Sequence, residues 1–366
     1  MAGVYISYPF CAQKCTYCNF ASGVFPRELE DRYLGALLSE LRTTQWPWTP
    51  ETVYLGGGTP SQMAPEALAS ILAAIPGSPN SGATWTEATM EAAPGGINAE
   101  RIAAWRDAGI NRVSLGVQSF VQKELARTGR RHTADIVEQE IALLRAAGIE
   151  SISVDLIAGL PGQTAASWSG SLNWIARLEV PHVSVYMLEV DEDSRLGREL
   201  LVLGSRYGAG DVPGEDAIAD FYEAAVERLA GLGLERYEIS NFARRGFESR
   251  HNLKYWRREP YLGFGADAHS FDGTQRWQNP EAAADYVAAP AAIERVAAEP
   301  FSEQFFLGLR LREGIESSSF PSTAADVVSR FVRDGLLERA AGRVRLTPRG
   351  VLLSNEVFAE FIEPAG

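Results

Sequence analysis

Cysteine is scarce in this sequence of 366 residues, and its only three cysteines, Cys11, Cys15 and Cys18, lie close together near the start. An odd, clustered set cannot form a disulfide framework for a chain of this length, so it indicates metal ligation in a reducing compartment. Long uncharged apolar runs are also lacking, which excludes a membrane-spanning helix. The first residues have neither the basic nor the apolar segment of a secretory signal. We therefore expect a soluble, cytoplasmic protein.

Basic residues are fewer than acidic ones. The chain has 34 Lys and Arg against 47 Asp and Glu, a net charge of −13, which argues against a broad phosphate-binding surface. Nucleic acid is therefore not an expected partner. A hydrophobic fraction of 46% with 22% charged residues is ordinary for a globular protein and excludes disorder. The length favours one large domain with a smaller one attached.

The first half of the chain alternates short β-rich runs with helical runs, a pattern typical of a parallel α/β sheet. One amphipathic helix has its apolar stripe between Leu29 and Leu41, and we expect Pro47 to end it. Six βα units are fewer than the eight of a full barrel, so we predict a partial, TIM-like (β/α)6 barrel over residues 1–200. The strands are predicted at Val4–Tyr8, Thr52–Leu55, Thr84–Met90, Arg112–Val117, Ser151–Leu156 and His182–Leu188.

Two further segments follow the predicted barrel. Residues 201–299 are less regular, and we expect a connecting α/β segment with a helix at Glu215–Ala230 and a strand near Arg236–Ile239. Residues 300–366 resemble a winged helix. The predicted elements are helices at 302–311 and 322–334, a hairpin turning at Gly342 and a last helix at 348–361. In an acidic chain this unit is expected to serve structure or partner docking rather than DNA binding.

The three cysteines form a CxxxCxxC motif directly after the first predicted strand. A structural zinc site would need a fourth protein ligand, and the histidine nearest in sequence is His132. A four-iron cluster held by three thiolates keeps one iron open for another ligand. The alternatives are unrelated core cysteines or a zinc site, and the spacing favours the cluster.

With Tyr17 just before the last cysteine, this motif resembles the signature of the radical S-adenosylmethionine (SAM) superfamily. The resemblance implies a [4Fe-4S] cluster whose open iron binds the amino and carboxylate groups of SAM. It also implies reductive cleavage of SAM to methionine and a 5′-deoxyadenosyl radical. The partial barrel is the fold of that superfamily, and the carboxyl ends of its strands would hold the cofactors.

Polar or glycine-rich segments follow several of the predicted strands. Glycine runs alone are also typical of tight βα turns, but here their order resembles the oxygen-independent coproporphyrinogen III oxidase branch of the superfamily. The resemblance extends over nearly the whole chain. It implies that the SAM pocket is lined by Tyr5, Tyr17, Gly57, Gly58, Thr59, Glu91, Gln118, Arg130 and Asp155.

Three features separate the chain from the oxidase and resemble its sister group, the HemW heme chaperones. Phe20 stands where the oxidase has a fourth cysteine, and only Met1, Ala2 and Gly3 precede the first predicted strand. Third, His251-Asn-Leu-Lys-Tyr255-Trp256 matches the HNxxYW motif of that group.

A histidine among aromatic residues suits heme, because neutral imidazole is a good axial ligand and aromatic rings pack on a porphyrin. His251, Tyr255 and Trp256 are therefore candidate heme residues, and Arg257 and Arg258 are placed to reach the propionates. On physical grounds alone, the alternative is that His251 caps a turn through hydrogen bonds while Tyr255 and Trp256 pack in the core.

The leading hypothesis is a heme-binding chaperone that retains a [4Fe-4S] cluster and a SAM site and delivers heme to membrane heme enzymes. Expected partners are heme, these recipient enzymes, an electron donor such as flavodoxin or ferredoxin, and a second copy of the chain in a homodimer. The alternative is an enzyme, either a coproporphyrinogen III oxidase or a radical SAM methyltransferase, although dehydrogenase activity is not expected. A zinc-stabilised scaffold is a third possibility.

Overall fold

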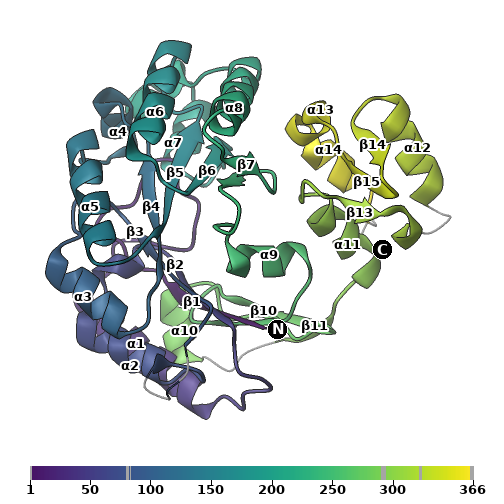
Figure 1. Ribbon diagram of the computed structural model, residues 1–366. Helices are drawn as coiled ribbons and strands as arrows, with labels where there is room; N and C mark the ends of the chain where they lie inside the picture. The colour runs from purple at the N-terminus through teal and green to yellow at the C-terminus, as the bar shows by residue number, and fades with distance from the viewer. Residues whose placement is uncertain (1, 80–81, 83, 290–293, 321–323, 363–366) are drawn as a thin grey trace.

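The computed structural model describes residues 2–79, 82, 84–289, 294–320 and 324–362. Six parallel strands lie in sequence order in one sheet, covered on the outside by helices (Figure 1). The predicted partial barrel is therefore confirmed. The strands are β1 (Gly3–Tyr8), β2 (Thr52–Gly57), β3 (Glu87–Ala92), β4 (Arg112–Gln118), β5 (Ser151–Ala158) and β6 (His182–Met187).

The helices that follow these strands bury one apolar face each. In α1 (Arg27–Thr43) the buried side chains are Tyr33, Leu37 and Leu41, which lie four residues apart and so share one face. The other helices of this half are α2 (Pro65–Ala73), α3 (Ala99–Asp107), α4 (Gln122–Thr128), α5 (Ala134–Ala146), α6 (Ala165–Leu178), α7 (Arg195–Leu201) and α8 (Glu215–Ala230), with short 3₁₀ turns at η1 (Pro60–Gln62) and η3 (Arg206–Asp211).

Most strand ends differ from the predictions by one or two residues, and two boundaries differ by more. Helix α1 ends at Thr43, before Pro47, because Thr44 adopts an extended conformation while its N–H still bonds to the carbonyl of Glu40. Strand β3 begins at Glu87 rather than Thr84. The start of β3 coincides with the first residue that pairs with β2, Glu87.

The sheet extends beyond the six strands on both sides, and of these added strands only one near Arg236–Ile239 was predicted from the sequence. Strand β9 (Tyr261–Phe264) pairs in parallel with β1, and β10 (His269–Phe271), β11 (Gln275–Gln278) and β12 (Val296–Ala297) continue antiparallel from it. On the other side β8 (Asn241–Ala243) pairs antiparallel with β6 and with β7 (Glu235–Arg236). Between β8 and β9 the chain forms α9 (Arg250–Trp256), and α10 (Ala283–Ala288) packs near α1.

The C-terminal unit is a small sheet, ordered β13-β15-β14, packed with helices (Figure 1). The predicted last helix is two helices, because the backbone at Leu353 leaves the helical conformation. The predicted start at Ser322 lies outside the described residues, and the helix there is observed from Ala325. The elements are α11 (Pro300–Gly308), β13 (Ile315–Glu316), η4 (Ser317–Ser319), α12 (Ala325–Arg333), β14 (Leu337–Ala340), β15 (Arg343–Leu346), α13 (Pro348–Leu352) and α14 (Ser354–Ala359).

A buried ion-pair cluster ties the C-terminal unit to the rest of the molecule. Glu303 of α11 accepts from Arg258 at 3.0 Å and from Arg276 of β11 at 2.6 Å, with 10% of its side chain exposed. None of the helices in the described ranges is both long and apolar enough to cross a membrane.

Candidate functional site

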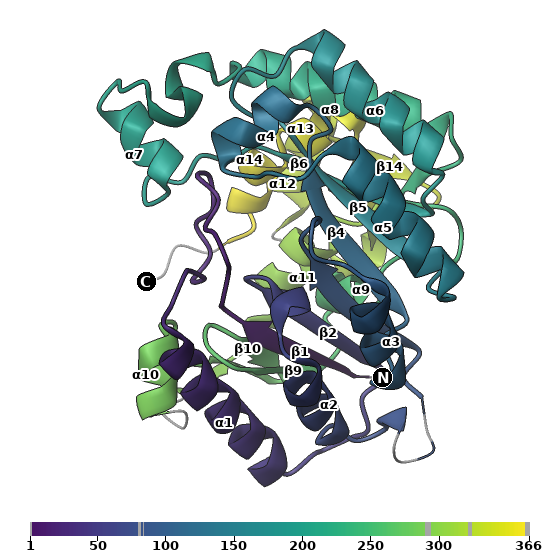
Figure 2. The same ribbon diagram turned by 90° about the vertical axis from the view of Figure 1, so that its left-hand side faces the viewer.

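The cysteine loop leaves the carboxyl end of β1 and is held by backbone contacts with distant segments. The N–H of Cys11 donates to the carbonyl of Gly23 at 2.8 Å, and that of Thr16 donates to the carbonyl of Thr128 at 3.2 Å. In Figure 2 this loop projects toward α7 at one side of the sheet. The loop is thus held in place near its start and its middle, and its three thiols form no disulfide.

The three thiols are partly buried and electrostatically coupled. Burial raises the pKa of Cys11. Hydrogen bonds from Thr59 and Ser22 lower this pKa, and the nearby Cys18 and Cys15 thiols raise it further. Within the described part of the chain, no three His, Cys, Asp or Glu side chains surround a point where a single metal ion would bind. A cluster instead gives each thiolate a different iron. Three thiolates on one loop are a donor set that suits a [4Fe-4S] cluster.

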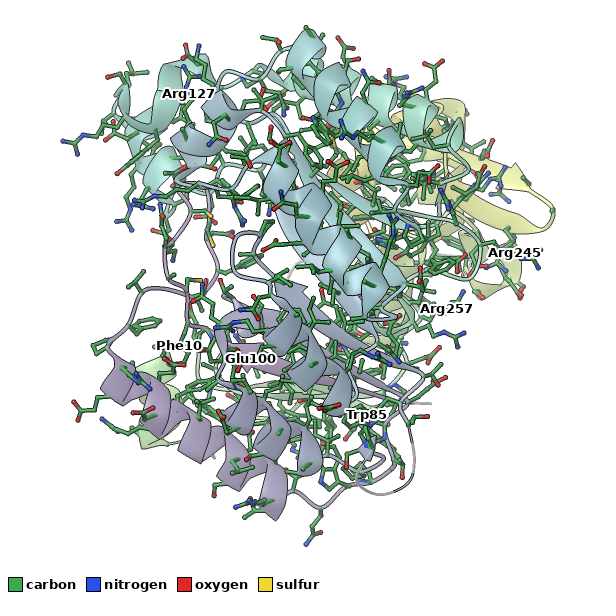
Figure 3. All side chains as sticks on the ribbon, turned by 60° about the vertical axis from the view of Figure 1, so that its left-hand side comes forward. Phe10, Trp85, Glu100, Arg127, Arg245 and Arg257 are labelled. Carbon is green, nitrogen blue, oxygen red and sulfur yellow. The ribbon has the colours of Figure 1, made fainter. Side chains whose placement is uncertain are left out.

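The glycine run after β2 lies directly against the cysteine loop. A Cβ atom at Gly58 would sit 2.9 Å from the Sγ of Cys11 and 2.7 Å from the carbonyl oxygen of Phe10, a contact that only glycine avoids. The N–H groups of Gly58 and Thr59 donate to the carbonyls of Tyr8 and Phe10 at 2.8 and 2.9 Å. The two predicted cofactor loops thus form one structure, with Phe10 at the foot of the cysteine loop (Figure 3).

Glu91 lies beside the same glycine run, at the carboxyl end of β3. Its carboxylate accepts from the hydroxyl of Tyr54 at 2.8 Å and from the N–H of Gly57 at 3.2 Å. A Cβ at Gly56 would be 3.0 Å from the hydroxyl of Tyr5 and 3.1 Å from Glu91 Oε1. Burial raises the pKa of Glu91 to about 7, partly offset by the hydrogen bond from Tyr54.

The end of β4 holds polar atoms that lack partners. Gln118 has a φ of +70°, unusual for a residue with a side chain, and its buried Oε1 has no hydrogen-bond partner among the described residues. Arg130 donates through Nη1 to the carbonyl of Gly116, but its buried Nε is also unpartnered within those residues. Arg130 also faces Tyr17 and Cys15. Buried polar groups normally have partners, so these atoms indicate a ligand site.

Asp155 differs from the other predicted cofactor residues because its acceptor atoms are already in use. Its carboxylate accepts hydrogen bonds from Ser114, Ser153 and Ser184 at 2.7–3.1 Å. Burial raises its pKa, and the three serine hydroxyls oppose that rise. Asp155 is therefore held in a network of three serine hydroxyls.

The HNxxYW motif is at the opposite end of the strands from the cysteines. His251 is fully buried, with Nδ1 2.9 Å from Thr52 Oγ1 and Nε2 2.8 Å from the Tyr255 hydroxyl. Thr52 pairs with Gly3 at the start of β1, whereas the cysteine loop follows Tyr8 at its end. Burial, followed by the charge of Lys254, lowers the pKa of His251 to about 3, so the imidazole is neutral.

Of the other two aromatic residues of the motif, Tyr255 packs against His251 and Trp256 packs against Arg310. The Tyr255 ring contacts His251 and Tyr261 edge-on, with centroids 5.1 and 4.6 Å apart. The guanidinium of Arg310 lies 4.3 Å from the centre of the Trp256 ring. Arg258 is bonded to Glu303 rather than free to reach a ligand, which corrects the expectation that it binds a propionate. The hydrogen-bonded alternative for His251 thus matches the observed geometry.

Tyr54 connects the two ends of the site, and the sequence analysis did not identify it. Its ring stacks on His251 with centroids 5.2 Å apart, while its hydroxyl bonds to Glu91. The sequence could have indicated Tyr54, because alternate residues of a strand share a face, and Tyr54 therefore lies on the same face of β2 as Thr52 and Gly56.

Comparisons with known proteins agree with this geometry. Residues 5–175 match the Radical SAM superfamily, and residues 297–353 match the HemN C-terminal domain. The heme chaperone HemW of Bacillus subtilis is 34% identical over 99% of both chains. That of Lactococcus lactis is 33% identical over 98% of this chain and 96% of the relative, and that of Escherichia coli is 31% identical over 98% and 97%.

Among solved structures, coproporphyrinogen III oxidase (HemN) from Escherichia coli, described as a radical SAM enzyme, has a similar fold. It superposes with a TM-score of 0.83 at 20% identity, covering 98% of this chain and 89% of the oxidase. At that identity the match establishes the fold alone. It includes the C-terminal unit as well as the barrel.

Proposed function

Because the chain belongs to the HemW family of the radical SAM superfamily, we propose that it is a heme chaperone that binds heme and passes it to heme-requiring membrane enzymes. The observation that carries the proposal is similarity to HemW proteins over nearly the full length of both chains. The three-cysteine loop packed against Gly58 supports retention of a cluster and SAM in the same protein.

We propose that Cys11, Cys15 and Cys18 hold a [4Fe-4S] cluster, which when bound would supply one-electron reduction of SAM. The glycine loop is proposed to receive the methionine end of SAM, because Gly58 brings its backbone directly against Cys11. Glu91 would accept from the ribose hydroxyls. The unpartnered atoms of Gln118 and Arg130 are suited to the remaining polar groups.

We propose that α9 organises the heme site and that His251 acts there as a positioning residue. Both of its ring nitrogens are engaged by Thr52 and Tyr255, so direct ligation of heme iron would require those hydrogen bonds to open. The backbone N–H groups of Arg250 and His251 donate to Glu87 at 2.9 Å, which anchors the start of the helix. The proposed partners also include a small electron-transfer protein such as flavodoxin or ferredoxin, and a second copy of the chain.

The direct test is heme transfer. Purified protein, reconstituted anaerobically, should bind about four irons per chain and shift the Soret band of added heme. When mixed with membranes that contain a heme-depleted recipient enzyme, the loaded protein should restore that enzyme's activity faster than free heme at equal concentration. Absence of any Soret shift would refute the chaperone proposal, and stoichiometric zinc without iron would refute the cluster.

The competing enzymatic function has its own test. Phe20 stands where the oxidase has a further cysteine, so we expect no conversion of coproporphyrinogen III to protoporphyrinogen IX by the reconstituted protein with SAM and reductant. Conversion under these conditions would replace the chaperone proposal with the oxidase. A Phe20→Cys variant should also fail to decarboxylate coproporphyrinogen III, because the chain differs from the oxidases at more positions than Phe20.

A further inference from the structure

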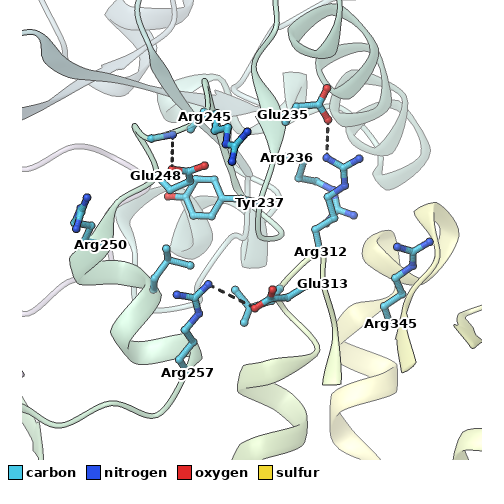
Figure 4. Close-up of a pocket in the computed structure, with 14 residues that line it drawn as sticks. Glu235, Arg236, Tyr237, Arg245, Glu248, Arg250, Arg257, Arg312, Glu313 and Arg345 are labelled. Carbon is cyan, nitrogen blue, oxygen red and sulfur yellow. Dashed lines mark hydrogen bonds and ion pairs between the residues drawn. The ribbon is translucent and has the colours of Figure 1, made fainter. Parts of the chain in front are cut away.

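A cavity of about 750 Å³ lies between the last strands of the barrel, α9 and the C-terminal sheet (Figure 4). This volume falls within the range of about 300–1,000 Å³ typical of small-molecule sites. The cavity is at the far side of the molecule from the cysteine loop, as the positions of Arg257 and Phe10 in Figure 3 show. Its charged lining consists of Arg236, Arg245, Arg250, Arg257, Arg312 and Arg345, with Glu235, Glu248 and Glu313.

The lining carries twice as many arginines as glutamates, in a protein whose net charge is −13. Two of the carboxylates are paired within the cavity, Glu235 with Arg312 at 2.6 Å and Glu313 with Arg257 at 3.5 Å. Glu248 accepts instead from the backbone N–H of Gly246 at 2.9 Å. Among the described residues, Arg236, Arg245 and Arg250 have no ion pair, so the cavity has uncompensated positive charge.

Arg236 is the least exposed of these three arginines, since Arg245 and Arg250 lie at the surface. Arg236 is half-buried on β7, and burial lowers the pKa of its guanidinium. The positive charges of Arg312 and Arg345 lower this pKa further, whereas Tyr222 and Glu238 raise it. A half-buried cation that faces other cations is stabilised by an anion that bridges them. The cavity is therefore built to receive a ligand with more than one negative group.

The rest of the lining is apolar enough for a flat hydrophobic body. Tyr237, Leu253 and Leu311 contribute rings and aliphatic surface between the arginines. Arg250 and Leu253 are three residues apart and so share one face of α9, and Arg257 directly follows the helix. That face lines the cavity, whereas His251 contacts Thr52 of β2. The HNxxYW helix thus separates the imidazole from the arginine cavity.

We propose that this cavity is where heme docks, with its two propionates bound by Arg236 and Arg250 and its ring against Tyr237 and Leu253. This inference rests on the proposed heme-chaperone function and locates its binding site on the outer face of α9. A dicarboxylate at the edge of an apolar macrocycle matches the combination of guanidinium groups and apolar wall. Arg245, Arg257 and Arg312 border the same space and would add positive potential (Figure 4).

The test compares heme with heme dimethyl ester, in which both propionates are uncharged. Affinities are measured by Soret titration for the wild-type protein and the Arg236→Gln/Arg250→Gln variant. Each charge-assisted hydrogen bond is expected to account for roughly tenfold in affinity. The variant should therefore bind heme at least about tenfold more weakly, but bind the dimethyl ester as well as the wild type does. An Arg32→Gln variant, altered at an exposed site on α1, is the matched control and should retain wild-type affinity for heme.

The possible outcomes separate this inference from the function on which it rests. No heme binding by the wild type would overturn both. Heme binding by the wild type that is unchanged in the double variant would overturn the cavity assignment alone. Displacement of heme by an equal concentration of inorganic pyrophosphate would identify a general polyanion site and would also overturn the assignment.

Folding of the variant is checked by thermal melting without heme. Because burial and neighbouring cations disfavour the charged Arg236, its replacement by Gln should leave the melting temperature unchanged or raise it. An Arg236→Lys variant, which keeps the charge but not the paired donors, should recover part of the lost heme affinity. Loss of heme affinity in Arg236→Lys as large as that in Arg236→Gln would contradict recognition of a propionate by the charge at this position. Lower affinity of the double variant for the dimethyl ester, matching its loss for heme, would contradict propionate recognition.

Discussion

The Nδ1 atom of His251 lies 2.9 Å from the Oγ1 atom of Thr52, at the start of the second barrel strand. This contact joins α9 to the amino-terminal end of β2. Tyr54 stacks on the same imidazole and donates a hydrogen bond from its hydroxyl to Glu91, so the contacts continue to Glu91. The histidine of the HNxxYW motif is therefore part of a buried network that begins beneath the proposed SAM site. Its effects on stability and on heme binding can be measured separately.

Replacement of His251 by Ala should lower the free energy of unfolding by about 2–4 kcal/mol, because it leaves a buried cavity and two hydroxyls without partners. Thr52→Val, which removes only one of these hydrogen bonds and keeps the volume, should cost about 1 kcal/mol. Urea unfolding of both variants checks the difference. A His251→Ala protein with wild-type stability and no heme binding would instead favour a role as iron ligand.

The neutral state of His251 predicts a dependence of stability on pH. Its pKa is lowered from 6.5 to about 3 in the folded protein, so below pH 6.5 the unfolded chain binds a proton that the folded chain does not. The stability contributed by this histidine is complete above pH 6.5 and should fall by up to about 1.4 kcal/mol per pH unit as the pH drops toward 3. Urea unfolding of wild type and His251→Gln between pH 5 and 7 should show a smaller decline in the variant. Equal slopes would contradict a buried neutral imidazole.

The contact between the glycine loop and Cys11 predicts that Gly58→Ala impairs cluster binding. A Cβ atom at position 58 would lie 2.9 Å from the Sγ of Cys11 and 2.7 Å from the backbone oxygen of Phe10, which cannot easily move. Iron content and absorbance after anaerobic reconstitution should fall well below those of the wild type. Gly35→Ala is the matched control, because a Cβ at Gly35 in α1 would meet no atom within 4 Å. That variant should keep its full iron content and gain about 0.5–1 kcal/mol in stability.

Glu91 predicts that SAM affinity depends on pH. With a pKa near 7, its carboxylate is mostly protonated at pH 6 and mostly ionised at pH 8, and the ionised form is the stronger acceptor for ribose hydroxyls. The dissociation constant of SAM, measured by equilibrium dialysis on the reconstituted protein, should therefore decrease from pH 6 to pH 8. Glu91→Gln should bind SAM more weakly and lose this dependence. A variant that retains the wild-type pH profile would exclude Glu91 as its source.

The barrel and the cluster loop could be predicted because their signals are local. The alternation of β-rich and helical runs identified six parallel strands, and the spacing of Cys11, Cys15 and Cys18 depends on neighbouring residues only. The flanking strands β9 to β12 were missed because they are short and are formed by pairing with β1, which is distant in sequence. The end of α1 was misplaced for a similar reason, since the chain leaves the helix to reach β2 well before Pro47.

Residue identity was enough to indicate a three-thiolate cluster, a glycine loop beside it and membership in a heme-related family, because each rests on a short motif or on its order along the chain. The environment of each side chain required the folded structure. Burial and two hydrogen bonds make His251 a neutral, internal residue. Three serine hydroxyls donate hydrogen bonds to the carboxylate of Asp155. The arginine cavity joins β7, α9 and the C-terminal sheet, which are separated by up to about a hundred residues, and so no sequence pattern contains it. Long-range packing determines which charges meet, and it brings Arg236 and Arg345 to the same cavity.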